Sequence, residues 1–204
     1  MISLGRKWSP FSIGDHFYIT SAPCNDDCRE KLTIVMGPGR AFGSGEHETT
    51  QHCLELMTSI PLTSQQRVLD FGTGTGILAI AAAKMQAGFV LAIDIEFDAA
   101  LSATNNSRLN QIEDRVKVVC GDVTCLCHLQ PFDIILANLQ ADIILDRLEL
   151  LSLLLNQHGY ILISGIHWDY LFDIKREFTR LNYQIVSQKS GNEYNTLLFH
   201  KECN

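Results

Sequence analysis

The stretch RVLDFGTGTG, from Arg67 to Gly76, decides the fold of this chain. Apolar residues lead directly into a glycine-rich turn, and small apolar residues follow it, which is the pattern of a strand, a tight turn and a helix. Glycine lets the chain reverse sharply and lets a ligand approach the backbone without a Cβ in the way. The N–H groups at the start of the helix then face that ligand. The stretch therefore predicts a nucleotide-type site at the carboxyl edge of a parallel sheet.

The spacing of the glycines distinguishes between classes of nucleotide. A dinucleotide fingerprint has the form G-x-G-x-x-G, and Ile77 occupies the position of its third glycine here. The glycines of this turn are Gly72, Gly74 and Gly76. Asp70 precedes them and is poorly placed to face a pyrophosphate. The pattern D-x-G-x-G-x-G suits a cationic ligand and, joined to Asp94 at the end of the next strand, resembles the S-adenosylmethionine (SAM) motif of class I methyltransferases.

Strand and helix patterns alternate outward from this motif, which is the signature of a doubly wound sheet. Parallel strands are predicted at 67–71, 89–94, 116–120, 132–138 and 160–164. Helices are predicted at 76–84, 97–110, 141–157 and about 167–181. Two final strands, 184–189 and 194–201, are joined by a tight turn and must be antiparallel. The predicted fold class is α/β, a Rossmann-like methyltransferase fold with a mostly parallel seven-stranded sheet and an antiparallel C-terminal hairpin.

A short β appendage is predicted before this core. Phe11 to Thr20 and Leu32 to Met36 have the pattern of two strands, and a glycine-rich loop follows. A helix then begins near Glu48, with its inward residues predicted as Cys53, Leu56, Met57 and Ile60. We therefore divide the chain into residues 1–45, with the strands and the loop, and residues 46–204, the main domain.

Size and charge restrict the function. The chain has 204 residues, 46% of them hydrophobic, and this length and composition predict one globular domain with at most a small appendage. Its net charge is −7. No block of Lys and Arg stands out, so tight binding to a nucleic-acid backbone is not indicated, although a local patch for a folded RNA stays open. The apolar run Ile77 to Ala83 is far shorter than a membrane span. The N-terminus has no signal-peptide pattern, and a cytoplasmic protein without membrane contact is expected.

The cysteines do not predict a disulfide scaffold, because the chain has seven of them. A zinc site built from two cysteine pairs is the alternative to free thiols in a reducing compartment, and no metal is expected since neither spacing is C-x-x-C. These pairs are Cys24 with Cys28 and Cys125 with Cys127, the second followed by His128. Cys53 and Cys120 are predicted to be buried residues of a helix and a strand.

A second segment narrows the assignment. GPGRAFGSGEHETT, from Gly37 to Thr50, resembles the D-P-G-x-A-F-G-T-G-T-H-P-T-T segment of the PrmA family, whose members methylate protein eleven of the large ribosomal subunit. The resemblance extends over nearly the whole chain, through DFGTGTGILAIAAAK at 70–84, AIDIE at 92–96 and ILANL at 135–139. The chain departs from the family at Glu46 and Glu48, where the family has Thr and Pro, and near Tyr194, where members often carry Trp. The small N-terminal domain with which bacterial members hold their substrate has no counterpart in this sequence.

The resemblance implies SAM as cofactor, with S-adenosylhomocysteine as product, and a protein substrate. It implies that the cofactor contacts are Thr50, Gly72, Asp94 and Asn138. From the residues themselves, Gly72, Gly74 and Gly76 would admit the amino-acid end of SAM. Asp70 would hold the cofactor's ammonium directly or through water, or would cap the turn. Asp94 would accept hydrogen bonds from both ribose hydroxyls, or would be a solvated strand-end acid.

The remaining candidates carry open alternatives. Asp122 would reach the adenine amine or cap a helix. Asn138 would orient the incoming amine at the methyl group or cap the helix from residue 141. His47 would orient the loop, contact substrate or cap the helix near Glu48. Thr50 would close over the methionine part of SAM, and Phe42, on the glycine-rich loop, would act as a lid.

The functional prediction is a SAM-dependent methyltransferase that modifies a protein nitrogen, either a lysine side chain or an α-amine. One alternative keeps the cofactor and takes a small molecule or RNA as acceptor, because fold alone does not decide the substrate. A second is a non-catalytic SAM-binding subunit, and a partner subunit or a homodimer fits either alternative. A nicotinamide oxidoreductase is disfavoured by Ile77.

Overall fold

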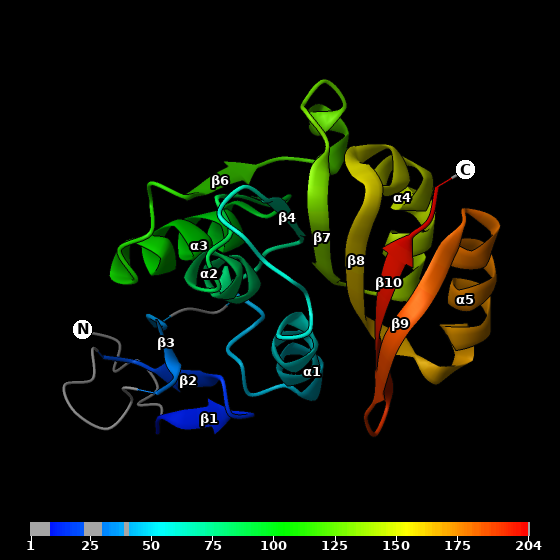
Figure 1. The fold of residues 1–204 in the computed structure, drawn as a ribbon. Helices are drawn as coiled ribbons and strands as arrows, with labels where there is room; N and C mark the ends of the chain where they lie inside the picture. Colours follow the sequence, from blue (N-terminus) through cyan, green and yellow to red (C-terminus); the bar gives the residue numbers. More distant parts are fainter. Residues whose placement is uncertain (1–8, 23–29, 39–40, 204) are drawn as a thin grey trace.

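The computed structural model describes residues 9–22, 30–38 and 41–203, and a seven-stranded sheet forms its centre (Figure 1). The strand order is β6-β5-β4-β7-β8-β10-β9. The strands from β6 to β8 are parallel, and β10 is antiparallel to both of its neighbours. Their bounds are β4 (Arg67–Phe71), β5 (Phe89–Asp94), β6 (Val116–Cys120), β7 (Phe132–Asn138), β8 (Leu155–His167), β9 (Tyr183–Ser190) and β10 (Tyr194–Lys201). The predicted fold class is confirmed.

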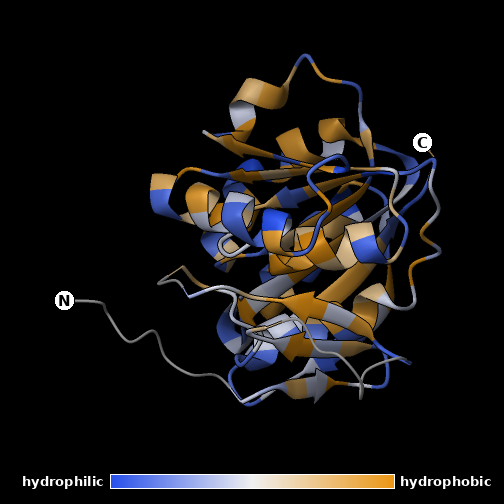
Figure 2. Ribbon diagram, turned by 90° about the vertical axis from the view of Figure 1, so that its left-hand side faces the viewer, coloured by the Kyte–Doolittle hydropathy of each residue, from blue (hydrophilic) through white to orange (hydrophobic). Residues whose placement is uncertain are grey.

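Helices cover both faces of this sheet. The α1 and α2 helices share one buried cluster, and α4 and α5 share another on the opposite face. The bounds are α1 (Glu48–Met57), α2 (Ile77–Lys84), α3 (Phe97–Leu109), α4 (Ala141–Leu154) and α5 (Leu171–Arg180), with short 3₁₀ turns η1 (Val123–Leu126) and η2 (Trp168–Tyr170). In the hydropathy view, hydrophobic residues concentrate along the central strands and on the small sheet (Figure 2). Every residue of α2 from 77 to 83 is buried.

The boundary between α4 and β8 differs from the prediction. The helix predicted to reach residue 157 ends at Leu154, because Leu155 is already extended and pairs with Phe132. The strand predicted from residue 160 therefore begins five residues earlier. The buried Lys201 side chain donates hydrogen bonds to the carbonyls of Ser152 and Leu155, so it satisfies carbonyl groups where the helix stops.

The N-terminal part forms a separate three-stranded sheet, with β1 (Phe11–Ile13), β2 (Phe17–Thr20) and β3 (Leu32–Val35). The prediction of one strand over 11–20 is wrong, because the chain turns at Gly14, which has a φ of +52°, and β1 and β2 form an antiparallel pair. The small sheet contributes Phe17 and Ile34 to the same buried cluster as α1 and α2. The predicted division into residues 1–45 and 46–204 therefore separates two sheets that share one hydrophobic core.

Two asparagines, Asn106 in α3 and Asn110 at the C-cap of α3, join this small sheet to the main body. The buried amide of Asn110 accepts a hydrogen bond from the Val35 N–H at 2.9 Å and donates to the Val35 carbonyl at 2.7 Å, much as a neighbouring strand would. Asn106 accepts from the Gly37 N–H and donates to the Thr75 carbonyl, both at 2.8 Å. The start of the loop after β3 is thus joined to the glycine-rich turn.

The cysteine predictions have mixed outcomes. Cys53 is buried, as predicted, but the prediction for Cys120 is wrong, because this residue is exposed at the end of β6, the edge strand of the sheet. Cys24 and Cys28 of the zinc alternative lie outside the described residues.

Ile60 is buried as predicted, but in the turn after α1 rather than in the helix. In the described part of the chain, no helix is long and apolar enough to cross a membrane.

Candidate functional site

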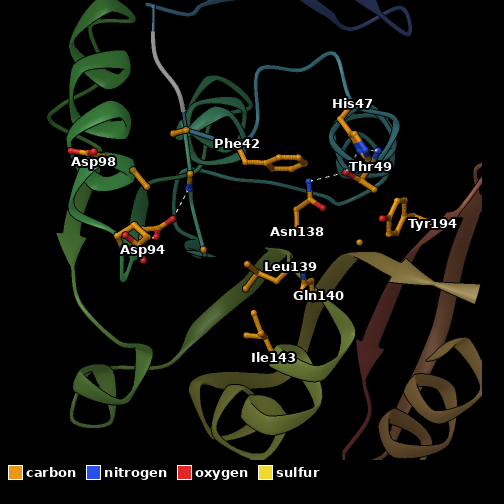
Figure 3. Close-up of a pocket in the computed structure, with 16 residues that line it drawn as sticks. Phe42, His47, Thr49, Asp94, Asp98, Asn138, Leu139, Gln140, Ile143 and Tyr194 are labelled. Carbon is orange, nitrogen blue, oxygen red and sulfur yellow. Dashed lines mark hydrogen bonds between the residues drawn. The ribbon is translucent and has the colours of Figure 1, made fainter. Parts of the chain in front are cut away.

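A cavity of about 660 Å³ lies where β4, β5 and β7 end (Figure 3). This volume is in the range of pockets that hold organic ligands of moderate size. The carboxyl edge of a parallel sheet is the expected place for such a pocket. Its lining consists of Ala41, Phe42, His47, Thr49, Gly72, Gly74, Asp94, Glu96, Asp98, Ala99, Asn138, Leu139, Gln140, Ile143, Gly165 and Tyr194.

The glycine-rich turn forms the floor of this cavity. Gly72 and Gly74 both line it and both have a positive φ, +71° and +55°. A Cβ at Gly74 would lie 2.4 Å from the Phe42 carbonyl oxygen, so glycine is required here for the close approach of the loop above. Gly76 does not line the cavity. A Cβ there would lie 3.0 Å from Ala103, so Gly76 serves the packing of α2 against α3 rather than the site.

Asp94 ends β5 and faces the cavity, and its contact with ribose hydroxyls stays a prediction. Its Oδ2 accepts a hydrogen bond from the Gly74 N–H at 2.8 Å, and its Oδ1 accepts from the Glu96 N–H at 3.0 Å. The carboxylate is therefore fixed between the turn and the start of α3. Each oxygen keeps further acceptor capacity for a hydroxyl group of a ligand. Glu96 and Asp98 also line the cavity and extend this acidic wall. Figure 3 shows Asp98 on the same side of the cavity as Asp94.

Asp70 lies beneath the turn and not in the lining of the cavity. It is 1% exposed, and its Oδ2 accepts hydrogen bonds from the Thr73 hydroxyl at 2.6 Å and from the Ala79 N–H at 3.1 Å. Burial raises the pKa of Asp70 to about 7, although these two hydrogen bonds act in the opposite direction. The contacts match the turn-capping alternative, and binding of a ligand's ammonium stays a prediction.

Asp122 occupies the helix-cap position that was its alternative. Its Oδ1 accepts from the Thr124 N–H at 2.8 Å at the start of η1, and its Oδ2 lies 3.5 Å from the Arg147 guanidinium. The hydrogen bonds from Thr124 hold the pKa of Asp122 below its usual value. The residue does not line the cavity. A role in adenine recognition therefore finds no support in this geometry.

Asn138 ends β7 at the middle of the cavity wall. Its Nδ2 donates to the Thr49 hydroxyl at 3.2 Å and to the Thr50 hydroxyl at 3.3 Å. It does not cap α4, whose N-cap residue is Gln140. Since the amide nitrogen is turned toward α1, the Oδ1 is left as an acceptor for a bound ligand.

The threonine that faces the cavity is Thr49 and not the predicted Thr50. Both threonines are buried, but only Thr49 lines the cavity. Successive residues of a helix point in directions about 100° apart, so only one of the two reaches the ligand side. The sequence motif contains both threonines and did not distinguish between them.

His47 takes the helix-cap position that was one of its predicted alternatives, and contact with a substrate stays a prediction. It is the N-cap of α1, where its Nδ1 accepts from the Thr49 N–H at 3.3 Å and lies 2.8 Å from the Thr49 hydroxyl, and it also lines the cavity. Its ring centroid lies 5.5 Å from that of Phe42 and 5.8 Å from that of Tyr194. Phe42 is 56% exposed on the loop, as the lid prediction expects. An aromatic wall therefore closes the cavity on the side of α1.

Several lining residues were missed by the sequence interpretation. The sequence indicates Tyr194 only as a departure from the family pattern. The residue reaches the cavity because β10 pairs with β8 beside it. Leu139 and Gln140 form the β7–α4 connection, and Ile143 lies in the first turn of α4. The rule that ligands bind at the carboxyl ends of parallel strands predicts a site at this connection. Among the described residues, no group of three or more His, Cys, Asp or Glu side chains is arranged to hold a metal ion.

Comparisons with known proteins agree with this geometry. A family model described as ribosomal protein L11 methyltransferase (PrmA) matches residues 3–202. A protein named ribosomal protein L11 methyltransferase from Caldicellulosiruptor saccharolyticus is 35% identical over 189 residues, which cover 93% of this chain and 61% of the relative. One from Desulfitobacterium hafniense is also 35% identical, over 89% of this chain and 58% of the relative. The chain thus spans about three-fifths of the length of these curated relatives.

A solved structure is similar over almost the whole chain. The crystal structure described as ribosomal protein L11 methylase from Lactobacillus delbrueckii subsp. bulgaricus has a TM-score of 0.83 and 29% identity, and the match covers 96% of this chain and 100% of that chain. A 16S rRNA methyltransferase of T. thermophilus in complex with AdoMet and guanosine has a TM-score of 0.65 and 21% identity over 79% of this chain and 45% of that chain, which is a likeness of fold.

Proposed function

Because the chain belongs to the PrmA family of ribosomal protein L11 methyltransferases, we propose that it methylates a protein nitrogen with SAM as the donor and S-adenosylhomocysteine as the product. The acceptor is a lysine side chain or an α-amine, and a ribosomal protein is the proposed substrate, which places the reaction in the cytoplasm. The observation that carries this proposal is one cavity in which Asp94, the glycine-rich turn and Asn138 meet.

The residues present fit SAM. Asp94 offers a fixed two-oxygen acceptor for the ribose hydroxyls, and the positions of Gly72 and Gly74 leave the floor open to the amino-acid part of the cofactor. Phe42, on the loop above, would cover the bound cofactor. When bound, SAM supplies an electrophilic methyl group on a positively charged sulfur.

The protein's contribution to the transfer is positioning. An amine of pKa about 10.4 must lose its proton, which at neutral pH costs about 4 to 5 kcal/mol. Desolvation and a neighbouring positive charge lower that pKa, so no strong general base is needed. The Oδ1 of Asn138 would accept a hydrogen bond from the amine and orient its lone pair, while Thr49 and Thr50 fix the amide.

The charge of the chain supports a basic substrate. The net charge is −7, from 16 basic and 23 acidic side chains. Opposite charges on enzyme and substrate accelerate their encounter. A lysine-rich protein fits this surface better than a polyanion such as RNA.

Calorimetry and a labelling assay test the proposal. SAM, S-adenosylhomocysteine and NADH are titrated separately, and tritiated SAM is then incubated with purified ribosomal proteins, ribosomal RNA and a metabolite extract. We expect heat with the first two ligands only, and label only in protein. Label confined to RNA or to a metabolite contradicts the protein substrate. Tight SAM binding without transfer to any acceptor supports the non-catalytic alternative, and binding of NADH alone overturns the cofactor assignment.

A further inference from the structure

The tip of the β9–β10 hairpin is hydrogen-bonded to the first turn of α1. Glu48, the first residue of α1, holds this contact. One of its carboxylate oxygens, Oε2, accepts from the Asn192 N–H at 3.0 Å, and the other, Oε1, accepts from the Glu193 N–H at 3.4 Å. Two segments that are 144 residues apart in the sequence are joined in this way.

The hairpin tip is shaped to receive the carboxylate. A Cβ at Gly191 would lie 2.6 Å from the Glu48 Cδ and Oε2, so the side chain occupies the space that any other residue at this position would fill. The Gly191 N–H donates to the Tyr194 carbonyl at 2.8 Å and closes the turn. Hydrogen bonding from the Asn192 N–H, reinforced by Glu193 and Tyr194, lowers the pKa of Glu48, which keeps the carboxylate ionised.

Tyr194 follows this tip directly and is the first residue of β10. It lines the cavity, and its ring centroid lies 5.8 Å from that of His47, the residue before Glu48. Tyr194 directly follows the hairpin turn, and His47 directly precedes Glu48. The two rings therefore flank the contact between Glu48 and the turn. Whatever fixes Glu48 against the turn also fixes Tyr194 relative to His47.

We propose that Glu48 is a positioning residue: its carboxylate clasps the hairpin turn at 191–193 and thereby fixes Tyr194 in the wall where the acceptor amine enters. The assignment of this wall to the acceptor rests on the proposed function. In Figure 3, Asp94 and Asp98 lie on one side of the cavity, and Thr49, His47 and Tyr194 lie on the other, with Asn138 between. The cofactor's ribose belongs to the Asp94 side, so the opposite wall is left for the acceptor.

A second link keeps the rest of the hairpin in place. Glu55, near the end of α1, forms an ion pair with Lys189 of β9. Loss of the Glu48 contact is therefore expected to free the turn without detaching the strands. Variants at Glu48 should fold.

Glu48→Pro and Glu48→Gln test the clasp, with Glu46→Gln as the charge-matched control. Proline is favoured at the first position of a helix, so Glu48→Pro removes the carboxylate and keeps the helix start. Glu46 lies two residues away and contacts Ser44 rather than the hairpin. We expect the KM for the acceptor to rise about tenfold in Glu48→Pro, as for loss of a hydrogen bond to a charged group, and less in Glu48→Gln, with SAM affinity changed less than about twofold.

Gly191→Ala tests the contact between Glu48 and the turn by a substitution in the hairpin. Its Cβ should displace the Glu48 carboxylate and raise the acceptor KM by a similar factor. In a Glu48→Ala background the same substitution should have no further effect, because the displaced group is gone. Additive effects of the two substitutions contradict the proposal.

Fluorescence gives a readout that does not need activity. The chain has two tryptophans, and the Trp168 Nε1 donates to the Asn192 carbonyl at 3.3 Å, so in a Trp8→Phe background Trp168 reports on the hairpin turn. Acrylamide quenching should increase in Glu48→Pro and stay unchanged in Glu46→Gln. Equal quenching and equal acceptor KM in these two variants overturn the clasp. If the unaltered chain neither binds SAM nor transfers methyl groups, the proposed function fails, and the quenching difference still decides whether Glu48 holds the turn.

Discussion

Asp94 has both of its carboxylate oxygens engaged by backbone N–H groups before any ligand binds. It therefore shapes the turn and offers the acceptor for the ligand at the same time. This double role explains why the end of the second parallel strand, as much as the glycine motif, defines the site. It also means that a substitution here alters the floor of the cavity.

Asp94→Ala is expected to weaken SAM binding about tenfold to a hundredfold, because bound hydroxyls lose a charged acceptor and the Gly74 N–H loses its partner. Calorimetric titration measures the change. Asp122→Ala is the comparison, since Asp122 caps η1 outside the cavity, and its SAM affinity should stay within about twofold of the unaltered protein. An equal loss in both variants would restore the adenine role predicted for Asp122.

The raised pKa of Asp70 predicts that the stability of the folded protein depends on pH. This pKa rises from an ordinary 3.8 to about 7 on burial, so between these pH values the folded protein holds the proton more tightly than the unfolded chain does. The stabilising contribution is complete below about pH 4 and is lost as the pH rises through about 7, by up to about 4 kcal/mol. Asp70→Asn keeps an acceptor oxygen for Thr73 and Ala79 and removes this titration. Urea unfolding at pH 5 and pH 8 measures the free energy of unfolding of the unaltered protein and of Asp70→Asn. An equal change between the two pH values in both proteins would contradict the expectation.

At the scale of elements, the glycine-rich turn and the loop above it form one packed unit. The Thr75 N–H donates to the Phe42 carbonyl at 3.0 Å, and the Thr75 hydroxyl donates to the Gly43 carbonyl at 2.6 Å. The loop is therefore held by the same turn that forms the floor of the cavity. Any residue larger than glycine at position 74 would separate the two.

Gly74→Ala is expected to weaken SAM binding and to lower stability by about 1–2 kcal/mol or more, since φ is positive and the new Cβ meets the Phe42 carbonyl. Gly76→Ala is the matched variant, because it has a comparable φ but its Cβ meets Ala103 of α3 away from the cavity. It should lower the melting temperature while the folded fraction keeps its SAM affinity. Thermal unfolding and calorimetry on both variants separate the two effects, and equal affinities would show that the loop does not depend on Gly74.

The order and type of the core elements could be predicted from the sequence, because glycine turns and apolar runs mark each strand locally. The errors fall where distant parts of the chain decide. Leu155 leaves its helix because Phe132 pairs with it, and Cys120 is exposed because β6 has no neighbour on one side. In the site, Asp94 and Asn138 were predictable as strand ends, whereas Tyr194 enters only through the pairing of β10 with β8. The choice of Thr49 over Thr50 depends on the rotation of α1, which two adjacent threonines do not reveal.

At the scale of the whole molecule, the small sheet is part of the main fold. Asn110 joins β3 to α3 through both polar groups of its amide, and Phe17 and Ile34 lie in the same core as α1 and α2. Unfolding of the small sheet would expose this shared core. The two sheets are therefore expected to unfold together.

Asn110→Ala should lower the free energy of unfolding by about 2–3 kcal/mol, because the Val35 N–H and carbonyl lose their buried partner. Chemical denaturation followed by circular dichroism measures this change and should show one transition. Asn105→Ala, on the exposed side of the same helix, is the control and should change stability by less than about 0.5 kcal/mol. A separate early transition in Asn110→Ala would mean that the small sheet melts on its own.

Helix α2 is enclosed on all sides, between the large sheet and the small one, and its first turn supports the floor of the cavity. A movement of this helix would disturb its contacts with both sheets at once, so we expect the floor to move least. Adjustment to a bound molecule is then expected from two segments that lie far apart in the chain and both reach the cavity, the loop around Phe42 and the turn before Tyr194. Amide hydrogens of α2 should accordingly exchange with solvent most slowly, and ligand-dependent protection should be largest in these two segments.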